Sequence, residues 1–128
     1  MMRLRTNTHV TSTIEALAGV APFSGYSPRD LRALTPHVDR LRVRPDTVLA
    51  REGQQARAFV IVLDGEVRAS RHGEVLTVDG PGAQIGGDAV LRHDPHQVTW
   101  TTVSDVEVLV VNGPAYRWAM QELLTDAA

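Results

Sequence analysis

The residues best suited to binding chemistry lie between Gly80 and Val98, in a segment with a glycine-rich turn, a short apolar run and a second turn. Glycine allows positive φ and a close approach of the backbone to a bound group, and successive N–H groups in such a turn form an anion-binding nest. Charged side chains that would complete such a site are largely absent. The segment predicts a small cradle for an anionic ligand, although clustered glycines also serve ordinary turns, and both interpretations stay open at this point.

The segments on either side of this turn have the pattern of β-strands. From residue 39 onward apolar and polar residues alternate, and the run from Ala58 to Leu63 is continuously apolar, which suits a central strand. The pair His72-Gly73 predicts a tight hairpin, and Ser104-Asp105 separates the last two strand segments. About seven or eight short strands at regular spacing are typical of a sandwich or barrel.

Helices are predicted on both sides of the strands. Ser27 is placed to cap a helix that begins at Pro28, and Pro36 is expected to distort or end that helix early. The sequence Asn112-Gly113-Pro114 gives a second cap and start, and residues 115–124 follow as a closing helix. One face of the closing helix is apolar and is expected to pack on the strands: Tyr116, Ala119, Met120, Leu123 and Leu124.

Length and composition indicate one globular domain. The chain has 128 residues, of which 43% are hydrophobic and 22% charged. Its net charge of −2 gives no electrostatic case for binding nucleic acid or a membrane. The absence of cysteine excludes disulfides and thiolate chemistry, and neither a signal peptide nor a membrane-spanning run is found. We therefore expect a cytoplasmic protein.

Several fragments occur in a fixed order along the chain: Pro22-Phe23-Ser24-Gly25, Arg51-Glu52-Gly53, Phe59 to Val67, Pro81 to Gly86, and Val106 to Val111. In this order and spacing they resemble the cyclic-nucleotide-binding domain of catabolite-activator-type regulators, kinase regulatory subunits and nucleotide-gated channels. The resemblance covers Leu17 to Leu124. It implies a mainly β fold with flanking helices, an antiparallel β-roll or jelly roll of the double-stranded β-helix type.

The resemblance also implies a domain division. It places a flexible segment at residues 1–10 and a single domain at residues 11–128. Within that domain we expect N-terminal helices at 12–38, the β-roll at 39–112 and the C-terminal helix at 113–124.

In the family, the ligand is held by a phosphate-binding cassette in which a glycine, a glutamate, an arginine and a neighbouring serine or threonine contact the cyclic nucleotide. Gly86 matches the glycine, whereas the glutamate position falls on Gly87, with Asp88 one residue later. The arginine position falls on His96 and the serine or threonine position on Gln97. The resemblance thus implies a degenerate cassette with these candidate binding residues: Gly86, Gly87, Asp88, Ala89, His96 and Gln97.

The function expected from the resemblance is a stand-alone, non-enzymatic regulatory or sensor module with weak, altered or lost cyclic-nucleotide binding. Its expected ligand is a cyclic nucleotide or another small anion, with no catalytic residue, metal or resident cofactor. The alternative is a cupin-like metal-binding protein or small enzyme on a similar β-roll. A cupin usually needs a His-x-His pair, which this sequence lacks.

Two expectations concern partners. The chain has no room after Leu124 for a helix-turn-helix domain, so we expect no direct binding to DNA. Trp118 lies opposite the apolar face of the closing helix, and tryptophan is enriched at interface hot spots. This predicts a homodimer or a partner contact around Trp118, with a half-buried tryptophan of no binding role as the alternative.

Overall fold

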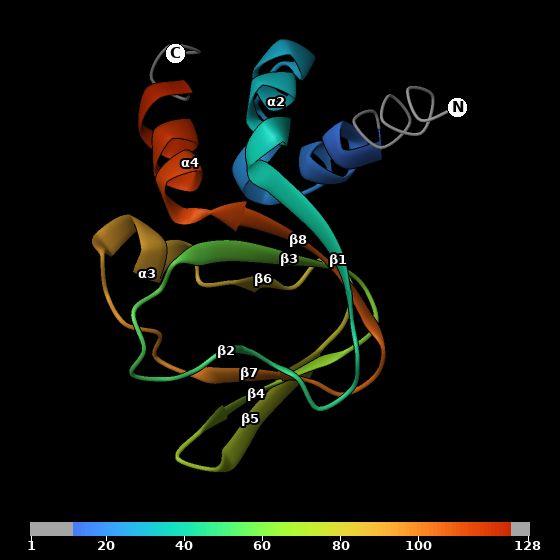
Figure 1. Ribbon diagram of the computed structural model, residues 1–128, viewed down its shortest axis with the longest axis vertical. Coiled ribbons are helices and arrows are strands. Elements are labelled where there is room, and N and C mark those ends of the chain that lie inside the picture. The colour runs from blue at the N-terminus through green and yellow to red at the C-terminus, as the bar shows by residue number, and fades with distance from the viewer. Residues whose placement is uncertain (1–11, 124–128) are drawn as a thin grey trace.

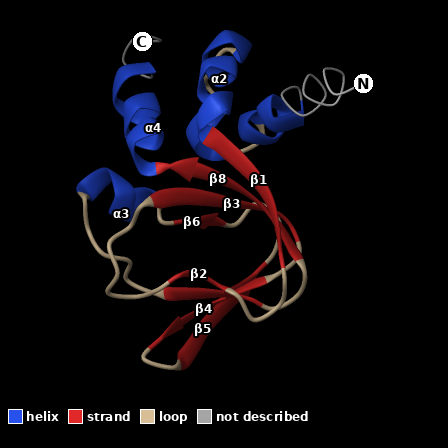
Figure 2. Cartoon of the chain, in the orientation of Figure 1, coloured by secondary structure: helices blue, strands red, loops and turns tan. Residues whose placement is uncertain are grey.

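The chain forms two four-stranded antiparallel sheets, and its computed structural model describes residues 12–123. In the first sheet the strand order is β1 (Val38–Val43), β8 (Val106–Asn112), β3 (Ala58–Asp64) and β6 (Gln84–Ile85). In the second it is β2 (Val48–Ala50), β7 (Thr99–Thr102), β4 (Val67–Arg71) and β5 (Glu74–Asp79). The sheets lie one above the other, the N-terminal and C-terminal helices lie beyond the first sheet, and the short helix that follows β6 lies at its side (Figures 1 and 2). The predicted mainly β fold with flanking helices is confirmed.

Strand β3 is buried on both faces, as its continuous apolar run predicts. Phe59 and Ile61 belong to a hydrophobic cluster that joins the first sheet to the helices. Val60 and Val62 belong to a second cluster between the two sheets. Because successive side chains of a strand point to opposite faces, this one strand supplies both cores.

The N-terminal helical layer contains a helix at residues 12–18, followed by η1 (Ala21–Phe23), α2 (Pro28–Leu34) and η2 (Thr35–His37). The predicted cap of α2 is confirmed, since the Asp30 N–H donates to Ser27 Oγ at 3.1 Å. The α-helix ends before Pro36 and continues as one 3-10 turn, because proline cannot supply the N–H of a continuing α-helix.

The closing helix begins as predicted, with α4 (Gly113–Trp118) capped by Asn112, whose side-chain oxygen accepts from the Ala115 N–H at 2.8 Å. It continues as a π-helical turn, η3 (Ala119–Leu123). Tyr116 and Ala119 are buried, and the half-buried Met120 and Leu123 pack against the same cluster. Residues 1–10, predicted to be flexible, and Leu124 lie outside the described residues.

Candidate ligand-binding site

The predicted cradle is formed by the end of β6, Gly86 and the short helix α3 (Gly87–Arg92). Gly86 has φ of 83°, a left-handed conformation that favours glycine. A β-carbon at this position would also lie 3.0 Å from the Ala58 carbonyl oxygen and 3.0 Å from Cε1 of His96. Glycine is therefore required both for the turn and for the close approach of its neighbours. The sequence analysis predicted no helix at α3 and described this segment only as a short apolar run.

All six predicted site residues line one cavity of about 370 Å³, which we call the cassette cavity. Its wall combines residues from distant parts of the sequence: Pro22, Phe59, Gln84, Gly86, Gly87, Asp88, Ala89, His96, Gln97, Val98, Trp100 and Tyr116. The structure thus brings the predicted residues together. That they bind a ligand stays a prediction.

The backbone of His96, the residue predicted at the family's arginine position, is held by two hydrogen bonds. Its N–H donates to the Gln54 carbonyl at 2.9 Å, and its own carbonyl accepts from the Gly53 N–H at 2.9 Å. The half-buried imidazole lies against Gly86, and this burial lowers the pKa of His96 below its usual range. A lowered histidine pKa favours the neutral ring at pH 7. The site therefore has no fixed positive charge at this position.

Aromatic side chains fill the space beside Gly87, the residue predicted at the family's glutamate position. A β-carbon at Gly87 would lie 3.1 Å from the Tyr116 hydroxyl and 3.4 Å from the ring of Phe59. These two rings are stacked, with centroids 4.4 Å apart and planes 25° apart. Burial, and secondly the charge of Asp88, raise the pKa of Tyr116, so its hydroxyl stays protonated near neutral pH. A side chain at Gly87 would have to displace the hydroxyl of Tyr116.

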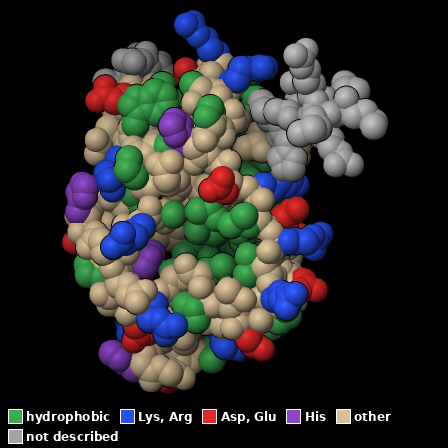
Figure 3. Space-filling view, in the orientation of Figure 1, with side chains coloured by type: hydrophobic (Ala, Val, Ile, Leu, Met, Phe, Trp, Pro, Cys, Tyr) green, Lys and Arg blue, Asp and Glu red, His purple; other side chains and the backbone are tan. Residues whose placement is uncertain are grey.

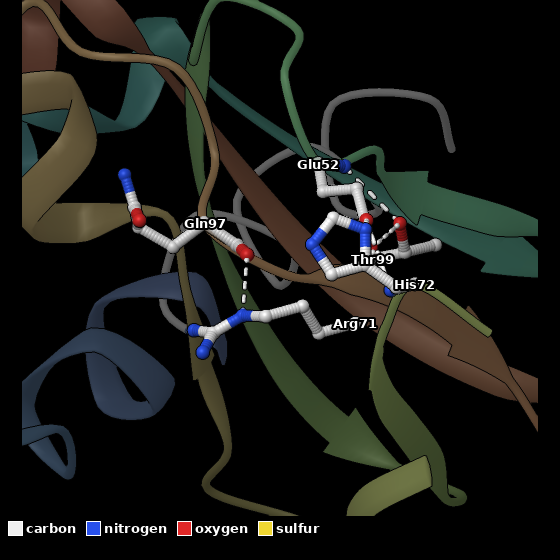
Figure 4. Close-up of polar contacts among 5 residues, drawn as sticks. All are labelled: Glu52, Arg71, His72, Gln97 and Thr99. Carbon is white, nitrogen blue, oxygen red and sulfur yellow. Dashed lines mark hydrogen bonds and ion pairs between the residues drawn. The ribbon is translucent and has the colours of Figure 1, made fainter. Parts of the chain in front are cut away.

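A cluster of polar side chains beside the cassette cavity joins its loops by hydrogen bonds (Figure 4). The Glu52 carboxylate accepts from the backbone N–H of His72 at 3.0 Å and from the hydroxyl of Thr99 at 3.1 Å. The hydrogen bond from His72 is the main reason that the pKa of Glu52 is lowered. On the same side, Nε of Arg71 donates to the Gln97 carbonyl at 3.3 Å. The β4–β5 hairpin is thereby tied to β7 and to the segment that carries Gln97.

The sequence analysis used Glu52 only as part of the Arg51-Glu52-Gly53 fragment and did not predict this role of its carboxylate. It also missed Phe59, Trp100 and Tyr116 as walls of the cavity, because it assigned Phe59 to a central strand and Tyr116 to helix packing. No local spacing connects these three residues. A fold-level comparison is the signal that could have found them.

Two further findings concern metal binding and membrane-spanning helices in the described part of the chain. Within residues 12–123, no group of three or more His, Asp or Glu side chains is arranged to hold a metal ion. None of the helices in this range is both long and apolar enough to cross a lipid bilayer.

Comparison with known proteins assigns the family. The profile of the cyclic nucleotide-binding domain matches residues 40–122, which is more than half of the chain, so the protein belongs to this family. A curated relative, the acetyltransferase Pat of Mycolicibacterium smegmatis, is 33% identical over 87 residues. That match covers 65% of this chain and 26% of the relative, so the chain spans about a quarter of the length of this curated relative.

Solved structures support the same fold. The regulatory domain of Toxoplasma gondii PKA, crystallised with cAMP, matches with a TM-score of 0.82 at 24% identity, over 93% of this chain and 47% of that one. A cyclic nucleotide-binding-like protein of Brucella abortus matches with a TM-score of 0.75 at 26% identity, over 87% of this chain and 99% of that one. The β-roll therefore occurs also in a chain that is hardly longer than the domain itself.

Proposed function

We propose that this chain is a non-enzymatic regulatory domain whose cassette binds cyclic nucleotides weakly or not at all. The observation that carries the proposal is the half-buried imidazole of His96 at the arginine position, with its pKa lowered by burial. An arginine presents a permanent charge and two parallel N–H groups to a phosphate. A neutral imidazole offers at most one N–H and no charge.

The second lost anchor is the glutamate. Gly87 has no side chain to accept from a ribose hydroxyl, and the exposed Asp88 lies one position further along α3. Each hydrogen bond to a charged group contributes about 1.5–3 kcal/mol, so two lost anchors cost about two to four powers of ten in affinity. The backbone of Gly86 and its neighbours remains available to an anion.

Calorimetric titration of the purified protein with cyclic AMP and cyclic GMP tests this proposal. We expect dissociation constants in the high-micromolar range or weaker for both nucleotides. The matched control is His96→Gln, which removes the imidazole and is expected to change the affinity very little. A sub-micromolar dissociation constant for either nucleotide contradicts the proposal.

The cupin-like alternative is not favoured by the family assignment. A cupin would require histidines and a carboxylate directed together into the β-roll. Metal analysis of the purified protein distinguishes the two, since stoichiometric iron, manganese or zinc would support the cupin-like alternative.

We also expect Trp118 to contribute to self-association. Its neighbours Tyr116 and Ala119 are buried against the helices, whereas Trp118 is 39% exposed on the other side of α4. Trp118→Ala is expected to lower the fraction of dimer measured by sedimentation velocity over a range of concentrations. Leu41→Ala, a change at another exposed apolar residue, is the control. An unchanged sedimentation coefficient and concentration dependence in Trp118→Ala would rule out this role.

A further inference from the structure

A second cavity, of about 460 Å³, shares His96 with the cassette cavity. We propose that it binds a small amphiphilic organic anion, with Arg51 and Arg57 holding the acidic group and the residues between the two sheets holding the apolar part. We call it the arginine cavity. This proposal does not depend on the strength of cyclic-nucleotide binding, because its cations come from the segment between β2 and β3 rather than from the cassette.

The floor of the arginine cavity is apolar. Ala50, Val60 and Ile85 line it, and all three belong to the buried cluster between the sheets. Figure 3 shows hydrophobic side chains gathered in a hollow near the middle of this face, with basic and histidine side chains beside it. A volume of this size lies within the range of about 300–1,000 Å³ that is usual for pockets of small organic ligands.

The charged side chains that line the arginine cavity are arginines. Arg51 and Arg57 line it, as do Gln54 and Gln55, and the lining contains no Asp or Glu. This local excess of positive charge stands in a chain whose net charge is −2. A concave site lined by charges of one sign concentrates ligands of the opposite sign.

Both guanidinium groups are available to a ligand. Neither has a hydrogen-bond or ion-pair partner within residues 12–123. The nearest acidic residue in sequence, Glu52, is engaged by His72 and Thr99. Arginine binds carboxylates, sulfonates and phosphates through paired N–H groups, so the geometry suits an organic acid with a planar or aliphatic body.

Anilinonaphthalenesulfonate is a suitable probe, because it combines an aromatic body with one sulfonate and becomes fluorescent in apolar surroundings. Phenylnaphthylamine has the same ring system without the charge and serves as the neutral probe. The test variant is Arg51→Gln/Arg57→Gln. The control variant is Arg42→Gln/Arg44→Gln, which removes two exposed charges from β1 and the turn after it.

We expect the wild-type protein to bind the sulfonate probe with one-to-one stoichiometry. The Arg51→Gln/Arg57→Gln variant should bind it about tenfold more weakly or worse, with unchanged affinity for the neutral probe. The control variant should bind both probes as the wild type does. An amide NMR spectrum of the test variant with the signal dispersion of the wild type shows that it is folded, because hydrophobic probes also bind partly folded chains.

Amide NMR spectra of the wild-type protein locate the probe independently of any variant. We expect the sulfonate probe to shift the signals of Ala50, Val60 and Ile85. The proposal is overturned if the wild type does not bind the sulfonate probe, if the test and control variants bind it equally, or if the shifts are confined to Gly87, Asp88 and Ala89.

Discussion

The double variant Gly87→Glu/His96→Arg is expected to bind cyclic AMP at least about tenfold more tightly than the wild-type protein. Arginine at His96 supplies the missing charge at the cassette cavity, and glutamate at Gly87 supplies an acceptor for the ribose. Each restored charged hydrogen bond is worth about 1.5–3 kcal/mol. The gain requires that the backbone turn at Gly86 has the shape that the phosphate needs. Calorimetry of the double variant and of each single variant measures it.

The Tyr116 hydroxyl limits this gain, because a β-carbon at Gly87 would lie only 3.1 Å from it. Contacts this short force the neighbour to move and cost packing energy. Tyr116→Phe removes the hydroxyl and keeps the ring on Phe59. We therefore expect the triple variant with Tyr116→Phe to bind more tightly than the double variant, while Tyr116→Phe alone binds no better than the wild type. A folded triple variant without any gain would show that the loop has a different shape from the family's cassette.

The second large expected effect is a loss of folding stability on substitution of Gly65, which lies at the turn between β3 and β4. Its φ is 90°, and a β-carbon there would overlap the carbonyl oxygen of Asp105 and lie 2.9 Å from a methyl group of Val106. Gly73, with φ of 81°, has no atom within 4 Å of the corresponding point. The left-handed conformation costs an alanine about 1–2 kcal/mol at either site, but the overlap adds about 1–3 kcal/mol at Gly65 alone.

We therefore expect Gly65→Ala to lower the free energy of unfolding by about 2–5 kcal/mol, and Gly73→Ala by only about 1–2 kcal/mol. Urea denaturation of both variants measures the two losses, and equal m-values ensure that the comparison is of stability. Equal losses in the two variants would mean that Asp105 and Val106 move aside freely, and that the close packing of this turn contributes nothing to stability.

The elements that depend on neighbouring residues could be predicted from the sequence. Ser27 and Asn112 mark the starts of α2 and α4 because a cap acts within three residues. The central strand β3 is visible because a strand that is buried on both faces has a continuous apolar run. The hairpin at His72-Gly73 follows from a two-residue turn in which both residues have positive φ.

The features that depend on distant residues could not be predicted in this way. Helix α3 has only six residues, too few to show a helical period, and its first residue is a glycine. The contact of Gly87 with Tyr116 joins segments far apart in the chain. The role of Glu52 depends on the backbone of a hairpin turn that approaches it only in the folded protein. The family resemblance predicted which residues meet at the cassette cavity, but it did not predict that the rings of Phe59 and Tyr116 pack beside them.

Strand β3 has a consequence for how a bound ligand could be sensed at a distance. Val60 lines the arginine cavity, and the next residue toward the N-terminus, Phe59, stacks on Tyr116 in the helical layer. One strand thus separates the arginine cavity from the helices, and on the helical side its residue Phe59 is packed in a buried cluster with Tyr116 and Ala119. Tightly packed interiors transmit a displacement rather than absorb it. A ligand in the arginine cavity that displaced β3 would therefore press on the contact between Phe59 and Tyr116, through which the displacement could reach α4.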